Sequence, residues 1–154
     1  MGMPGSWNPT DHPYLTPDNH SISGEEDPTY NCIAWAAGDT ERWWWPASRA
    51  GVAYWPKQVT RSRDLACFIA AFRTLGYREC EDGSLDPDLE KVALFARDEK
   101  GMLVPTHAAR QLASGEWTSK MGRCERITHQ TLEAVSGPLY GDPVVFLSRG
   151  RLRR

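Results

Sequence analysis

The stretch LVPTHAARQLASGEWTSKM, residues 103–121, decides the fold that this sequence predicts. Its two ends, residues 103–112 and 116–121, are extended-type segments separated by the turn-forming sequence ASG. Two such segments with a short glycine-containing connection are typical of a β-hairpin. Shorter apolar runs at residues 91–96 and 144–147 predict one strand before the hairpin and one after it. We therefore expect an antiparallel meander in the second half of the chain.

An amphipathic helix is predicted over residues 62–75, in the first half of the chain. Four apolar side chains follow the i, i+3, i+4, i+7 spacing of one helix face: Leu65, Phe68, Ile69 and Phe72. Ser62 is a suitable N-cap residue and Gly76 is a suitable stop. We expect this face to form a main part of the core.

A shorter helix is predicted over the sequence TYNCIAWAA, which ends before Gly38. Asn31 or Thr29 can cap its N-terminus, and glycine suits the position after its last turn. Cys32 therefore lies at or near a helix N-terminus. A further short helix is expected at residues 128–135. Helices followed by antiparallel strands indicate an α+β fold, with N-terminal helices packed on a small antiparallel sheet.

The length of 154 residues, with 40% hydrophobic and 25% charged residues, fits one globular domain with one core. Residues 1–27 are rich in Pro, Gly, Asn, Asp and Ser without periodicity, and we expect an irregular lead-in there. Residues 28–148 are expected to form the single α+β domain. Residues 149–154 are expected to form a basic, solvated tail.

Charge and hydropathy argue against several classes of partner. The net charge is −2 and the isoelectric point is about 6.1, so no electrostatic attraction to nucleic acid is expected. No apolar run approaches the roughly 18–20 residues that span a bilayer, and we expect no membrane partner. The sequence MGMPGSWNPTDHPYL has neither the basic leader nor the apolar core of a Sec signal peptide. We expect a cytoplasmic location, and secretion by another route stays open.

The four cysteines show no CxxC pair: Cys32, Cys67, Cys80 and Cys124. In a reducing compartment a disulfide framework is not expected. A zinc site would need ligands from widely separated positions, without the usual paired spacing. The sequence therefore predicts no metal and no cofactor. Cys67 lies beside the apolar stripe of its helix, and we interpret it as a small packing residue.

A cysteine hydrolase needs a thiol, a histidine that acts as base and a third polar group that orients the histidine. Cys32 at the helix start supplies the thiol, and His107 on the first strand of the hairpin supplies the base. Folding the hairpin brings Ser119 or Lys120 close to His107. A neutral serine can accept the imidazole N–H, whereas a protonated lysine would repel an imidazolium. His129 is the alternative third member.

The blocks NCIAWA, THAARQL, WTSKMG and ITH carry a resemblance to known sequences. They resemble a family of uncharacterised bacterial domains with Asn-Cys-x-x-x-Ala, His-Ala and Trp-x-Ser-Lys-x-Gly blocks. The same order of blocks is similar to the NlpC-type and CHAP-type branches of the papain-like superfamily of cysteine hydrolases. The resemblance covers roughly residues 28–148. It implies a papain-like fold, with Cys32 as nucleophile and His107 as base.

Two hypotheses of function follow. The first is a cysteine hydrolase or acyl transferase that acts on a peptide, isopeptide or other amide-containing substrate, with Asn31 and the Cys32 backbone N–H binding the oxyanion. Six side chains are expected to line its substrate site, although the tryptophans can instead be structural: Trp35, Trp44, Trp45, Trp55, Trp117 and Lys120. The second hypothesis is a non-catalytic papain-like interaction module that presents its aromatic loop to a protein partner.

Overall fold

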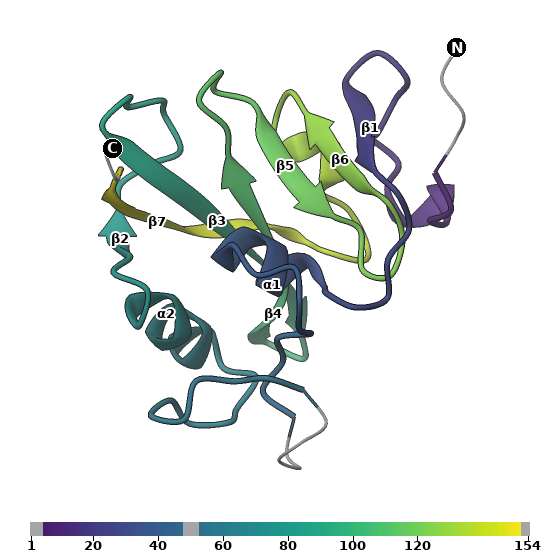
Figure 1. Cartoon of the computed structure of the whole chain (residues 1–154). Helices are drawn as coiled ribbons and strands as arrows, with labels where there is room; N and C mark the ends of the chain where they lie inside the picture. The colour runs from purple at the N-terminus through teal and green to yellow at the C-terminus, as the bar shows by residue number, and fades with distance from the viewer. Residues whose placement is uncertain (1–4, 48–52, 152–154) are drawn as a thin grey trace.

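An antiparallel sheet forms the centre of the molecule (Figure 1). The computed structural model describes residues 5–47 and 53–151, and the sheet within these ranges has seven strands. Their spatial order is β1 (His20–Gly24), β6 (Arg126–His129), β5 (Trp117–Lys120), β4 (Met102–Gln111), β3 (Leu89–Glu99), β7 (Asp142–Gly150) and β2 (Arg78–Cys80). The helical elements are α1 (Cys32–Ala37), α2 (Leu65–Arg73) and the 3₁₀ turns η1 (Pro9–Asp11) and η2 (Glu133–Val135). The α+β class is confirmed, with a larger sheet than the sequence predicted.

The predicted hairpin lies in the middle of the sheet. β4 and β5 pair next to their turn, where Arg110 lies opposite Thr118, and the Leu112 N–H donates to the Glu116 carbonyl. The pairing covers two residues of each strand. Farther from the turn α1 packs against both strands, as Figure 1 shows. This arrangement leaves the β4 backbone around His107 facing the start of the helix.

The segment after the hairpin is the strand β6. The prediction of a helix over residues 128–135 is therefore wrong for residues 128 and 129. β6 pairs with β5 on one side and with β1 on the other. Ile127 and His129 are buried, whereas Arg126 and Thr128 are partly exposed. Burial that alternates with a period of two is typical of a strand. Helical geometry appears later, in η2.

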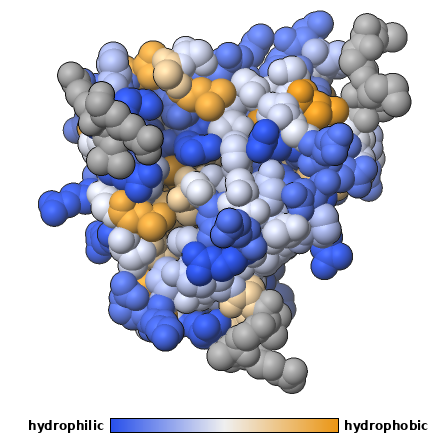
Figure 2. Space-filling model, in the orientation of Figure 1, coloured by the Kyte–Doolittle hydropathy of each residue, from blue (hydrophilic) through white to orange (hydrophobic). Residues whose placement is uncertain are grey.

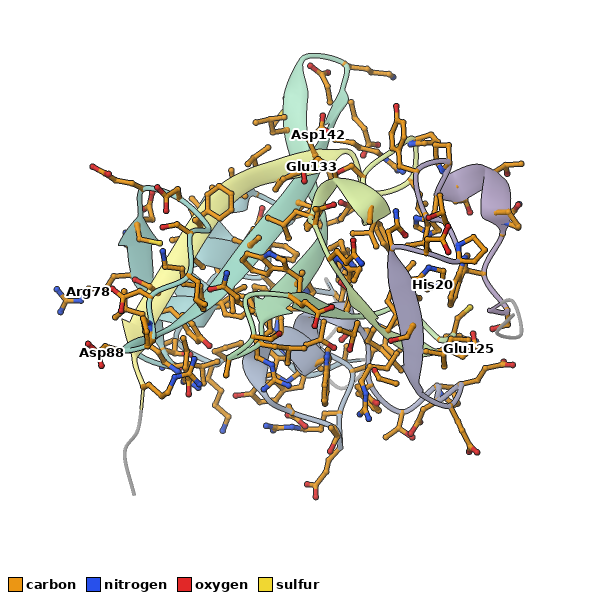
Figure 3. The ribbon with its side chains drawn as sticks, turned by 90° about the horizontal axis from the view of Figure 1, so that it is seen from above. His20, Arg78, Asp88, Glu125, Glu133 and Asp142 are labelled. Atoms are coloured by element: carbon orange, nitrogen blue, oxygen red, sulfur yellow. The ribbon has the colours of Figure 1, made fainter. Side chains whose placement is uncertain are left out.

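The predicted irregular lead-in contributes an edge strand to the sheet. β1 pairs with β6, and His20 lies opposite His129. Figure 3 shows His20 at this edge and Arg78 and Asp88 at the opposite one. The side chains of β1 are partly or fully exposed, so its sequence has no apolar alternation. This explains why local composition did not indicate a strand.

Two arginines that were predicted to lie in a solvated tail, Arg149 and Arg151, are anchored to the rest of the fold. Arg149 belongs to β7, forms an ion pair with Glu90 at 2.7 Å and donates to the Leu75 carbonyl at 2.8 Å. Arg151 donates to two backbone carbonyls of the segment that leads into β3. The rest of the predicted tail, residues 152–154, lies outside the described residues.

The sheet buries side chains on both of its faces. On β3, Val92 and Leu94 pack in a cluster with α1 and α2, whereas Ala93 and Phe95 pack in a second cluster. Successive residues of a strand point to opposite faces, so both faces of β3 need apolar side chains. Burial on both faces explains why the sequence of this strand, predicted at residues 91–96, is an uninterrupted apolar run.

Two aromatic rings of α2 are fully buried. Phe68 and Phe72 have 0% exposure, whereas Leu65 and Ile69, predicted to be buried with them, are partly exposed. The helix begins at Leu65, with Asp64 in the N-cap position. The prediction of an amphipathic helix is therefore confirmed, with a narrower buried stripe than expected.

On the face that Figure 2 shows, the surface is mostly hydrophilic, and small hydrophobic patches lie apart from one another. Within the described ranges, none of the helices has the length and apolar character that crossing a membrane requires.

Candidate active site

The start of α1 is fixed by the side chain of Asn31. Its Oδ1 accepts hydrogen bonds from the backbone N–H groups of Ala34 at 3.1 Å and Trp44 at 3.0 Å, and its Nδ2 donates to the Trp44 carbonyl at 2.7 Å. Asn31 is therefore the N-cap, as one of the two predicted alternatives. The side-chain amide that was predicted to bind an oxyanion is thus engaged with the backbone of Ala34 and Trp44.

Replacing Asn31 by alanine is expected to lower the free energy of unfolding by about 2 kcal/mol, because a helix cap and two further buried hydrogen bonds are lost. Urea unfolding measures this change. The matched control is Thr29→Ala, since Thr29 is exposed and lies outside the cap. We expect the control to change stability by less than about 0.5 kcal/mol. Equal effects of the two substitutions would contradict the assignment of the cap.

Cys32 is the first residue of α1, and its thiol is buried against β4. The Sγ atom lies 4.0 Å from the Thr106 carbonyl oxygen. Burial raises the pKa of Cys32 to about 11, and the N–H groups of Ala108, Ile33 and Cys32 itself act in the opposite direction. The thiol is therefore protonated at neutral pH in this resting structure.

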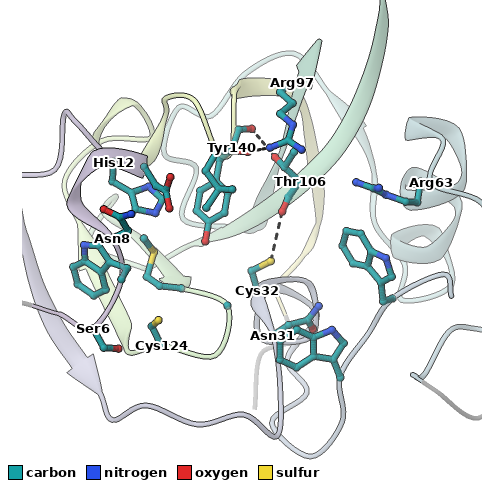
Figure 4. A pocket seen from close by; sticks show the side chains of 17 residues that line it. Ser6, Asn8, His12, Asn31, Cys32, Arg63, Arg97, Thr106, Cys124 and Tyr140 are labelled. Atoms are coloured by element: carbon teal, nitrogen blue, oxygen red, sulfur yellow. Dashed lines mark hydrogen bonds between the residues drawn. The ribbon is translucent and has the colours of Figure 1, made fainter. Parts of the chain in front are cut away.

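A cavity of about 530 Å³ opens above this thiol (Figure 4). Arg63 and Arg97 lie on one side of Cys32 in this view, and His12 lies on the other. The aromatic residues of its lining are Trp7, Trp43, Trp45 and Tyr140. The cavity is large enough for one amino-acid side chain of a peptide together with an amide group next to the Cys32 sulfur.

His107 lies on β4 opposite Phe95 and is 1% exposed. Its ring stacks on Tyr140 with 4.0 Å between centroids, and it meets the edge of Phe95 at 5.2 Å. Burial lowers the pKa of His107 well below its ordinary value, and the neighbouring His129 and His12 add to the effect. The imidazole is therefore neutral at neutral pH.

The two nitrogens of His107 have different surroundings. Nε2 lies 2.9 Å from the Ser119 Oγ, whereas the buried Nδ1 has no hydrogen-bond partner among the described residues. The Cys32 thiol contacts Thr106, the residue before His107, and lies near the N–H of Ala108, the residue after it. Neither ring nitrogen of His107 forms a hydrogen bond with the Cys32 thiol in this structure.

Ser119 and His129 are both part of the arrangement, although the sequence left them as alternatives. The Ser119 Oγ lies 2.8 Å from Nε2 of His129, and Nδ1 of His129 lies 2.7 Å from the Thr131 carbonyl oxygen. The predicted proximity of Ser119 to His107 is confirmed. His129 arrives from β6, the neighbour of β5, and not from a separate helix. Burial lowers the pKa of His129 to about 4, and the hydrogen bond to Thr131 opposes this effect.

Lys120 was predicted to line the substrate site, but it is not among the residues that line the cavity. Its side chain is completely buried, and Nζ donates to the backbone carbonyls of Asp27 at 2.6 Å, Tyr30 at 3.1 Å and Gly122 at 2.6 Å. These bonds satisfy the donors of a buried ammonium group. Lys120 therefore ties the segment before α1 to the sheet.

The predicted tryptophans divide between the core and the cavity. Trp44, Trp55 and Trp117 are at most 4% exposed and pack in the two core clusters rather than at the cavity. Trp35 is partly buried, and its Nε1 donates to the Thr118 Oγ1 at 3.1 Å. Of the tryptophans that were predicted to line the substrate site, Trp45 is the one that lines the cavity.

Several lining residues were not identified from the sequence. Trp7 and His12 come from the N-terminal segment that was predicted to be irregular, and Tyr140 comes from the loop before β7. His12 is 3% exposed, and its ring lies 4.9 Å from that of Tyr140. The sequence did contain one signal for this contribution: a tryptophan and a histidine lie within the proline-rich lead-in, and such residues are seldom fully exposed in a linker.

No group of three or more His, Cys, Asp or Glu side chains within residues 5–47 and 53–151 is arranged to hold a metal ion.

The fold and the site define an α+β domain in which Cys32 lines a cavity. His107, Ser119 and His129 are buried and are not among the residues that line it, although the His107 ring stacks on the lining residue Tyr140. The chain belongs to a family described as a domain of unknown function (DUF7689), whose model matches residues 21–148. The match begins in β1, within the segment predicted to be a lead-in. No curated protein and no solved structure matches the chain.

Proposed function

We propose that this chain is a papain-like cysteine hydrolase or acyl transferase that acts on an amide-type bond of a peptide, isopeptide or related substrate. Its support is a short helix that begins with Cys32 and packs on an antiparallel sheet, with a histidine on β4 and its polar partner on β5. The observation that carries the proposal is the environment of His107: Ser119 holds Nε2, Nδ1 has no partner, and the Cys32 thiol lies against the adjoining backbone.

In the proposed reaction, the Cys32 Sγ attacks the substrate carbonyl carbon while its proton passes to Nδ1 of His107. The carbonyl π electrons move to the oxygen, and the backbone N–H of Cys32 binds the resulting oxyanion. His107 then gives the proton to the leaving amine as the C–N bond breaks, which produces a thioester. Water, or an acceptor amine in a transferase, attacks this thioester and gives a proton to His107. The C–S bond then breaks, and His107 returns the proton to the Cys32 sulfur, which releases the product and restores the thiol. Because the resting thiol is neutral, proton transfer accompanies the attack.

A short peptidyl vinyl sulfone with an aromatic side chain tests this proposal, because the cavity walls are aromatic. At pH 7.5 we expect the adduct at Cys32 to form about tenfold faster or more than adducts at Cys67, Cys80 or Cys124. His107→Ala should slow the adduct at Cys32 by about a hundredfold or more, the usual contribution of a general base. Peptide mass mapping over time gives all four rates. His20→Ala is the matched control, since His20 lies on β1 outside the cavity lining, and it should leave the rate unchanged.

The raised pKa of Cys32 favours a second candidate, a non-catalytic papain-like interaction module. In that case the thiol is a packing group, and Trp43 and Trp45 at the cavity contact a protein partner. Equal labelling rates for the four cysteines, with no effect of His107→Ala, would reject the enzyme and support the module.

A further inference from the structure

Four groups form a continuous hydrogen-bonded chain on the side of His107 away from its unpartnered nitrogen. The chain runs from Nε2 of His107 to the Ser119 Oγ (2.9 Å), on to Nε2 of His129 (2.8 Å), and from Nδ1 of His129 to the Thr131 carbonyl (2.7 Å). The three side chains are at most 1% exposed. We propose that the Thr131 carbonyl sets the tautomer of His107 through this chain, so that Ser119 and His129 act as positioning residues.

The Thr131 carbonyl, at the end of the chain, determines which group donates in each hydrogen bond. A backbone carbonyl only accepts, so Nδ1 of His129 must carry a proton. A neutral imidazole has one N–H, so Nε2 of His129 is an acceptor, and Ser119 donates its hydroxyl proton to it. The Ser119 oxygen must then accept from the remaining neighbour, which is Nε2–H of His107. Nδ1 of His107 is consequently left without a proton.

This arrangement of protons requires both imidazoles to be neutral, and their burial supports this condition. Burial lowers the pKa of His129 to about 4 and lowers that of His107 well below its ordinary value. The serine hydroxyl carries a single proton, so it cannot donate to both histidines. With the direction fixed at Thr131, a single arrangement of protons satisfies every bond of the chain.

The consequence for catalysis rests on the proposed function. A base needs a free lone pair at the nitrogen that receives the thiol proton, and the chain reserves Nδ1 of His107 for this purpose. During the attack Nδ1 accepts the proton of Cys32, while the proton on Nε2 stays in place and continues to donate to Ser119. If the direction were reversed, Ser119 would donate to Nε2, and the only imidazole proton would occupy Nδ1.

Nitrogen-15 NMR of the histidine side chains at pH 7.5 tests the assignment without any substrate. In the wild-type protein we expect the Nε2–H tautomer for His107 and the Nδ1–H tautomer for His129. In Ser119→Ala the tautomer of His129 should remain, while His107 should show a mixture. A dominant Nδ1–H tautomer of His107 in the wild-type protein would overturn the proposal, whatever the activity.

Two substitutions of His129 provide a matched pair. His129→Phe removes the acceptor for Ser119, so the hydroxyl can turn to His107, and we expect labelling of Cys32 to slow by about tenfold or more. His129→Gln keeps an amide that can accept from Ser119 and donate to Thr131, and it should restore most of the rate. Equal rates in folded Phe and Gln variants would reject the positioning role. The expected tautomers without any selective labelling of wild-type Cys32 would reject the proposed enzyme but not the tautomer assignment.

Discussion

Lowering the pH from 7 to 4.5 is expected to reduce the free energy of unfolding, with His129 alone removing about 2.5 kcal/mol. The pKa of His129 falls from about 6.5 in the unfolded chain to about 4 in the folded protein, because the ring is buried. Between these two values the unfolded chain binds more protons, so the unfolded state gains stability as the pH falls. His107 and His12, whose pKa values are also lowered by burial, add to the loss in the same direction.

Urea unfolding at several pH values measures this loss. Between pH 7 and pH 4.5, His129→Gln should lose about 2.5 kcal/mol less than the wild-type protein, because glutamine does not titrate. The carboxylates with lowered pKa values, such as Glu125 and Asp39, contribute below about pH 4.5, outside this window. Equal stability at pH 7 and pH 4.5 in the wild-type protein would show that the histidines are accessible to protons in the folded state.

Replacing Phe68 by alanine is expected to cost about 3–5 kcal/mol of stability, the range for removing a buried aromatic ring. Phe68 is completely buried, and its ring packs edge-on against Trp45 at 5.5 Å and Trp55 at 5.1 Å. The ring supports one wall of the cavity through Trp45, so the same change should also weaken labelling of Cys32. Denaturant unfolding followed by tryptophan fluorescence gives the stability change.

Leu65→Ala is the matched control on the same helix. Leu65 is partly exposed, so its truncation should cost less than half as much as that of Phe68. A cost below about 1 kcal/mol for Phe68→Ala would mean that the site collapses around the missing ring without loss of packing.

The strength of a local pattern decided which elements the sequence could predict. The run around Phe95 and the hairpin from His107 to Ser119 have strong local signals, and β3, β4 and β5 lie at these positions. The weak signals of β1 and β6 were misread, because these strands obtain their hydrogen bonds from partners far away in the chain. The alternating burial of residues 126–129 identifies β6 as a strand only when its partner strands, β1 and β5, are known.

The candidate site shows the same division. Asn31 as N-cap and Cys32 as first helical residue follow from local helix-capping chemistry, and Ser119 follows from the geometry of a hairpin. The cavity could not be predicted, since Trp7 and Tyr140 meet there from opposite ends of the chain. The raised pKa of Cys32 was equally inaccessible, because it depends on burial by residues that are distant in sequence.

The sequence by itself determined the α+β class, the hairpin and the position of Cys32, because periodicity, turn residues and caps act over a few neighbouring residues. Only the tertiary structure decided that His129 joins Ser119 instead of replacing it, and that Lys120 binds three carbonyls instead of facing a substrate. Hydrogen bonds between β5, β6 and the loop before α1 depend on strand order and burial. A single sequence does not encode these properties in any local pattern.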